Sequence, residues 1–120
     1  MDDRPVSGYQ EVAHTADWAL KVWAPDLTQL LKTAVQGMYD LMGLQLDRSQ
    51  SESGQISIQS DDHESLLVAF LSEILYYIES ESIGFDDFHL VIEGNLLHAD
   101  LYGFKVACLA KEIKAVTFHY

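Results

Sequence analysis

The sequence predicts an α+β fold: a mostly antiparallel or mixed β-sheet with two amphipathic helices packed on one face, as a two-layer sandwich. Apolar residues recur with helical spacing in two segments and alternate with polar residues in most of the others. Helices and strands do not alternate regularly along the chain, which disfavours a parallel sheet built from βαβ units. The length of 120 residues suits one domain, residues 1–120, around a single core.

Two strand-like segments precede the first helix. Residues 9–12 form a short candidate strand, and residues 18–24 alternate so that one face is apolar. Helical spacing of apolar residues then runs over 27–42. Asp26 stands where a helix cap is expected, and Gly43 follows the last apolar position, as helix-ending glycines do. We therefore expect an amphipathic helix between these two residues.

The middle of the chain holds the second helix. Residues 47–54 are polar and lack periodicity, so a loop is predicted there, followed by a short strand at 55–59. Asp61 and Glu64 repeat the spacing of a capping box. Apolar positions over 66–78 then line one face of a helix whose other face is acidic.

The last third of the chain is again strand-like. Residues 88–92 and 97–101 alternate on either side of Gly94-Asn95, which predicts a hairpin. Residues 104–110 are ambiguous between a short helix and an irregular crossing. The β-branched and aromatic residues of 112–120 predict a final strand.

The charge of the chain excludes some partners. The formal net charge is −12 with seven Lys and Arg, so direct binding to RNA or DNA is disfavoured, whereas divalent cations or a basic protein partner are favoured. The single cysteine, Cys108, rules out an internal disulfide and is expected to be a small buried residue in a reducing compartment. The N-terminus does not resemble a signal peptide, and no apolar stretch approaches the ~20 residues of a membrane span. We expect a soluble, cytoplasmic protein.

Two pairs of residues are candidate sites. His14 and Asp17 stand just before a strand, where Asp17 could ligate a divalent cation or meet a partner. From the residues alone, the favoured interpretation is a turn in which Asp17 or Thr15 bonds the backbone. His98 and Asp100 share one strand face, where metal ligation is conceivable in principle. A solvated outer face is the favoured interpretation of that second pair.

Three further residues have side chains that could bind a partner or act as a nucleophile. Lys114 and His119 form a basic handle that could meet an acidic patch on a partner, although Lys114 could instead pair with a neighbouring carboxylate. Cys108 would act as a nucleophile only beside a base and an oxyanion site, and the sequence indicates neither. Phosphate-binding, zinc and serine-hydrolase motifs are missing, so catalysis by this chain alone is unsupported.

Four separated stretches resemble the archease family. The first is Tyr9 followed by His14, Thr15, Ala16 and Asp17, which is similar to the family's Tyr and His-Thr-Ala-Asp signature. The others are similar to the family's first helix, its acid-capped second helix and its Lys-Ala-Val-Thr-x-His strand. In this sequence they read DLTQLLKTAVQGMYDLM, DDHESLLVAFLSEILYYIESE and EIKAVTFHY. Together the stretches cover nearly all of the chain, in the family's order.

The resemblance implies a partner and a metal. Archeases assist RtcB-type tRNA-splicing RNA ligases by promoting their guanylylation and multiple turnover. The family's site for calcium or another divalent ion, such as magnesium or manganese, falls here on Asp17. The family pattern continues beyond Tyr120 to a second carboxylate, which we expect to be absent from this chain. Lys114 is a further functional position implied by the resemblance.

The resulting hypothesis is an accessory protein of the archease type. The segment around His14 and Asp17, with Lys114 and His119, would contact the ligase rather than the tRNA, without binding nucleic acid or membrane. The alternative is a general chaperone or interaction module without a metal role, which predicts exposed apolar surface. An independent metal-dependent hydrolase is a third reading, without an identified nucleophile or base. The sequence does not specify an oligomeric state.

Overall fold

The computed structural model describes residues 6–12, 19–111 and 116. It contains five strands, two α-helices and one π-helical turn within these residues. In chain order they are β1 (Gly8–Val12), β2 (Ala19–Trp23), α1 (Leu27–Met42), β3 (Gln45–Gln59), α2 (His63–Tyr76), the π-helical turn η1 (Tyr77–Glu81), β4 (Ile83–Glu93) and β5 (Leu96–Cys108). The α+β class is confirmed, and every strand pair is antiparallel.

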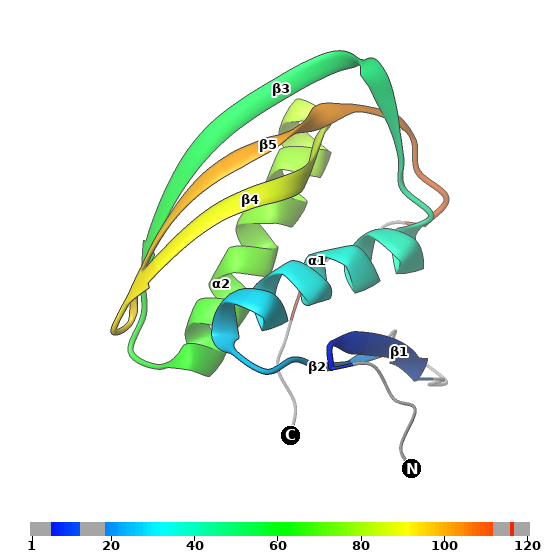
Figure 1. Cartoon of the computed structure of the whole chain (residues 1–120). Coiled ribbons are helices and arrows are strands. Elements are labelled where there is room, and N and C mark those ends of the chain that lie inside the picture. The colour runs from blue at the N-terminus through cyan, green and yellow to red at the C-terminus, as the bar shows by residue number, and fades with distance from the viewer. Residues whose placement is uncertain (1–5, 13–18, 112–115, 117–120) are drawn as a thin grey trace.

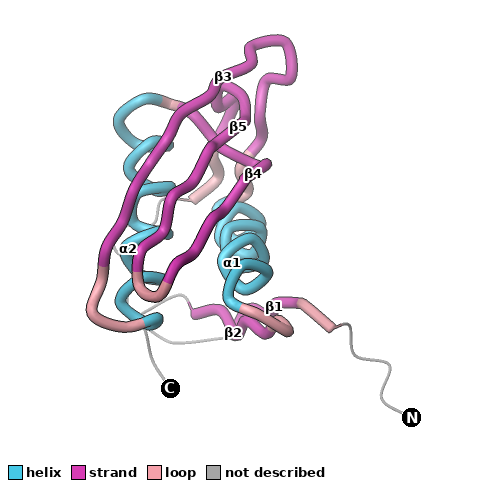
Figure 2. The backbone as a smooth tube through the Cα atoms, turned by 60° about the vertical axis from the view of Figure 1, so that its left-hand side comes forward, coloured by secondary structure: helices cyan, strands magenta, loops and turns pink. Residues whose placement is uncertain are grey.

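The strands form two separate sheets rather than one. The larger sheet has the order β3-β5-β4 and arches over both helices, while β1 and β2 pair as a two-stranded ribbon (Figure 1). Figure 2 shows α1 between this ribbon and the larger sheet. The prediction of two helices on one sheet face holds for the larger sheet, and the ribbon adds a further layer against α1.

The apolar faces of the helices and the sheet meet in one core. Phe70 of α2 packs edge-to-face on Phe88 of β4, with 5.7 Å between ring centroids. Leu31 of α1 and Leu101 of β5 are fully excluded from solvent in the same cluster. Burial of such side chains contributes about 1.5–3 kcal/mol each, so this shared core holds the helices against the sheet.

Both helix starts are capped by an aspartate. Asp26 accepts a hydrogen bond from the backbone N–H of Gln29 (2.8 Å), as predicted. The second helix is capped by Asp62, which accepts from Ser65 (2.7 Å), so the prediction that Asp61 caps it was one residue early. Either aspartate fits the sequence pattern. In the structure Asp62 is the residue with extended backbone angles immediately before the helix, which is the conformation of an N-cap residue.

The prediction of a loop at residues 47–54 was wrong. Strand β3 runs through this segment and pairs with β5, but its register shifts between Asp47 and Ser51. Asp47 accepts hydrogen bonds from the backbone and hydroxyl of Ser49 and from the amide of Gln50, which lowers the pKa of Asp47. The turn-forming residues thus make a bulge inside a long strand, because pairing with β5 resumes beyond it.

The hairpin prediction is confirmed, and the ambiguous segment is now assigned. Gly94, with φ of +60°, and Asn95 form the two-residue turn between β4 and β5. Residues 104–108 continue β5 as a strand. Cys108 at its end is exposed, so its predicted burial was wrong. Of the predicted final strand at 112–120, all but Val116 lies outside the described residues.

Candidate functional site

The four predicted site residues, His14, Asp17, Lys114 and His119, lie outside the described residues. The structure does describe the strands that flank the first two. Val12 ends β1 and Ala19 begins β2, and these two residues are direct partners in the antiparallel ribbon. This ribbon is therefore the described element nearest to Asp17 in the sequence.

The ribbon sits in a notch on helix α1. Gly37 is buried at the centre of the helix, and a Cβ atom built on it would lie 2.9 Å from Cγ of Tyr9 and 3.1 Å from Cδ1 of Leu20. The missing side chain thus lets strands β1 and β2 approach the helix backbone. The hydroxyl of Tyr9 also donates a hydrogen bond to Asp40, one turn further along α1. This hydrogen bond raises the pKa of Tyr9.

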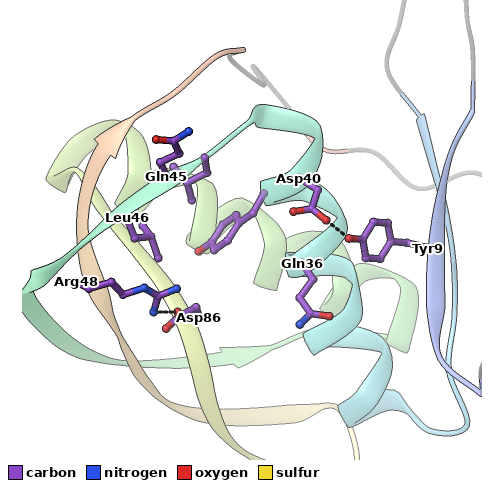
Figure 3. Close-up of a pocket in the computed structure, with 9 residues that line it drawn as sticks. Tyr9, Gln36, Asp40, Gln45, Leu46, Arg48 and Asp86 are labelled. Carbon is purple, nitrogen blue, oxygen red and sulfur yellow. Dashed lines mark hydrogen bonds and ion pairs between the residues drawn. The ribbon is translucent and has the colours of Figure 1, made fainter.

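A cavity of about 490 Å³ opens beside this junction, between the ribbon, α1 and one end of the larger sheet (Figure 3). Its residues come from four elements and the turn after α1, and most of them are polar. They are Tyr9, Gln36, Tyr39, Asp40, Leu44, Gln45, Leu46, Arg48 and Asp86. The cavity therefore brings together segments that are far apart in the sequence.

The two sides of this cavity differ in their charges. On the sheet side, a guanidinium nitrogen of Arg48 lies 2.6 Å from a carboxylate oxygen of Asp86, and the guanidinium also lies 4.6 Å from the ring centroid of Phe104. On the helix side, Asp40 accepts from the hydroxyl of Tyr9. No Lys, Arg or His among the described residues forms an ion pair with Asp40.

Tyr39 is the buried tyrosine among the residues that line the cavity. Its buried hydroxyl donates to the backbone carbonyl of Phe85 (2.7 Å), and burial raises the pKa of this phenol well above its usual range. The phenol is therefore a neutral structural donor at neutral pH.

His98 and Asp100 lie on the outer face of the larger sheet. His98 shares a 2.8 Å hydrogen bond between its Nδ1 and the hydroxyl of Ser57, and Asp100 accepts from the amide of Gln55 (3.0 Å). Both are cross-strand pairs on a solvated face, which was the favoured interpretation of these residues. A small hollow of about 170 Å³ beside them is also lined by His89.

The described part of the chain holds neither a cluster of metal-binding side chains nor a membrane-spanning helix. No group of three or more His, Cys, Asp or Glu side chains in residues 6–12, 19–111 and 116 is arranged to hold a metal ion. The expected metal ligand, Asp17, lies outside these ranges. Within the same ranges, no helix is long and apolar enough to span a bilayer.

The cavity residues were not singled out from the sequence, although one signal was present. Gln36 and Asp40 are exposed polar residues one turn apart on α1, between neighbours that are buried. On an amphipathic helix such a pair indicates surface that the packed elements leave exposed to solvent. Arg48 and Asp86 carried no comparable signal, because their strands, β3 and β4, are separated along the chain by α2 and η1 and in the sheet by β5.

The geometry defines an acidic α+β domain in which a β-ribbon is seated on one helix. Comparison with known proteins identifies its family. Residues 9–120 match the sequence model of the archease protein family (MTH1598/TM1083), and the chain belongs to this family. The motif resemblance is confirmed.

Two curated relatives and one solved structure are similar to this chain. Protein archease of Pyrococcus abyssi is 28% identical over 119 residues, which cover 92% of this chain and 84% of that protein. Protein archease of Methanopyrus kandleri is 30% identical over 125 residues, covering 92% and 85%. The solution structure of Protein 1598 of Methanobacterium thermoautotrophicum matches with a TM-score of 0.65 at 22% identity, covering 93% of this chain and 85% of that one. This last match shows the shared fold.

Proposed function

We propose that this chain is a cytoplasmic accessory protein that activates an RtcB-type RNA ligase in tRNA splicing and RNA repair. It would promote guanylylation of the ligase and allow it to turn over repeatedly. The observation that carries this proposal is the family match over residues 9–120. The net charge of −12 supports contact with the enzyme rather than with the tRNA, because phosphates are repelled by an acidic surface.

The proposed functional end of the protein is the tip segment, residues 13–18, together with Lys114 and His119. Asp17 would bind a divalent cation, and His14, Lys114 and His119 would contact the ligase. A bound cation would supply positive charge close to the phosphates during nucleotide transfer. The strands that precede and follow this segment in the sequence contact α1 at Gly37, and Tyr9 hydrogen-bonds Asp40 of the same helix.

The test is multiple-turnover guanylylation of an RtcB-type ligase by GTP with the wild-type chain, with Asp17→Ala and without any addition. Parallel assays with magnesium, manganese and added calcium address the choice of metal. Glu73→Ala is a matched control, because Glu73 is an exposed carboxylate on α2, outside the tip segment. The proposal expects stimulation by the wild type and the control and its loss in Asp17→Ala. Stimulation that survives in Asp17→Ala would remove the metal role.

The alternative, a general chaperone or interaction module, predicts apolar binding surface. Val91 and Tyr102 are exposed on the outer face of the larger sheet (41% and 48%). The strand register places a polar row between them, formed by Gln55, Asp100 and His89. These two residues therefore do not form a continuous apolar patch. The same assay separates the two functions, because a chaperone would not require Asp17.

A further inference from the structure

We propose that the cavity between β1, α1 and the end of the larger sheet is a docking site for an arginine side chain of the protein partner. This inference deepens the proposed function, on which it rests for the identity of the partner as the ligase. The nine described residues that line it belong to β1, α1, the turn after α1, β3 and β4.

The first argument is space. The cavity of about 490 Å³ is far larger than the ~10–15 Å³ that a single water requires, so a long side chain can enter with its hydration water. Figure 3 shows polar groups on opposite sides of it, with Asp40 and Gln36 on α1 and Arg48 and Asp86 on the sheet.

The second argument is that this cavity already binds one guanidinium. Arg48 pairs with Asp86 at 2.6 Å and lies over the ring of Phe104, yet its side chain remains 66% exposed. A carboxylate and an aromatic face are the two groups that arginine uses most effectively in recognition. The sheet side is thus occupied by a group of the kind that we propose for the helix side.

The third argument is the state of Asp40. It is an exposed carboxylate that accepts a hydrogen bond from Tyr9 through Oδ2, and no cation in the described part of the chain pairs with it. An ionised carboxylate has about four acceptor positions, and a side chain of the described residues donates to one of them. The hydroxyl of Tyr9 donates to one oxygen of the carboxylate, and Gln36 lies one turn before Asp40 on the same helix.

Charge favours an arginine over an anion or a metal. Asp40 and Asp86 repel phosphate groups, and a divalent cation would need six or more oxygen ligands, more than these two carboxylates supply. A planar guanidinium can bind the carboxylate of Asp40 in a bidentate manner. The net charge of −12 would speed encounter with a basic surface.

The probe experiment needs no ligase. The tripeptide acetyl-Gly-Arg-Gly-amide is titrated into the whole labelled chain while backbone amide shifts are followed by NMR, and the same peptide with citrulline in place of arginine serves as the neutral control. We expect saturable shifts at residues 36–48 and 86 with the arginine peptide. Asp40→Asn should weaken binding by about two- to fivefold, the range of an exposed ion pair, while Glu73→Gln leaves it unchanged.

A second variant tests the sheet side in the opposite direction. Arg48→Gln releases Asp86, so it should tighten binding of the arginine peptide by a similar factor. The proposal is overturned if the citrulline peptide binds equally, if Asp40→Asn and Glu73→Gln behave alike, or if the shifts spread over the acidic residues of α2.

The ligase assay then identifies the partner. Asp40→Asn should raise the concentration of this chain that gives half-maximal stimulation and leave the maximal stimulation unchanged, in contrast to Asp17→Ala. An unchanged half-maximal concentration would overturn the ligase as the source of the arginine. Failure of the wild-type chain to stimulate any ligase would instead refute the proposed function, and the peptide titration would still decide whether the cavity binds arginine.

Discussion

Replacing Gly37 with alanine tests whether close contact between the ribbon and α1 requires a residue without a side chain at this position. In an isolated helix the change would stabilise by about 0.5–1 kcal/mol, because glycine loses more backbone entropy on folding. Here the new Cβ would lie 2.9 Å from Cγ of Tyr9, the atom where the ring joins its side chain, which cannot move without the whole ring. Overpacking of this kind costs about 1–3 kcal/mol.

The two effects predict a net destabilisation of about 1 kcal/mol for Gly37→Ala. Leu20 adds little, because its contact at 3.1 Å is made by the end of a flexible side chain. In a Tyr9→Ala background the ring is gone, so Gly37→Ala should there stabilise by about 0.5 kcal/mol or more.

Urea unfolding of the wild type, the two single variants and the double variant completes a thermodynamic cycle. The expected coupling free energy between Gly37 and Tyr9 is about 1.5–2 kcal/mol. Hydrogen exchange of the β1 amides should quicken in Gly37→Ala alone, which places the strain at the ribbon. If Gly37→Ala stabilises the wild-type background, or if the coupling free energy is near zero, the proposed steric contact between residue 37 and the ring of Tyr9 is refuted.

The remaining predictions concern the larger sheet and the second helix. Gly103→Ala would place a Cβ 2.6 Å from Cα of Phe85, a backbone atom that cannot move aside. The free energy of unfolding measured in a urea titration should therefore fall by about 3 kcal/mol. Tyr39→Phe removes a buried donor to the carbonyl of Phe85, and thermal unfolding should show a loss of about 1–2 kcal/mol. The hydrogen bonds from Ser65 lower the pKa of Asp62 in the folded chain. Its contribution to stability is therefore present above the unfolded-state pKa and is lost as the pH falls through the lower folded-state pKa. Asp62→Asn should have the same free energy of unfolding as the wild type at neutral pH, because asparagine is also a good helix cap. Between about pH 5 and 2 its free energy of unfolding should fall less than that of the wild type. An equal dependence of the free energy of unfolding on pH in the two proteins would contradict this.

The functional residues divide according to how they could be found. His14, Asp17, Lys114 and His119 were selected by residue type and by resemblance to a family, and they remain predictions because they lie outside the described residues. The cavity residues could not be selected in that way. Asp40 and Asp86 belong to elements separated along the chain by one strand, one α-helix and the π-helical turn, so their proximity is a property of the packed fold.

The sequence by itself determined the elements whose signals are local. Helical spacing and the caps at Asp26 and Gly43 placed α1, and Gly94-Asn95 placed the hairpin, because each signal acts between residues a few positions apart. Only the tertiary structure decided the rest: β3 continues through a polar bulge because β5 lies beside it, and α1 is buried on two sides because Gly37 admits the ribbon. These outcomes depend on contacts between distant segments, whose energies appear only when the chain is folded.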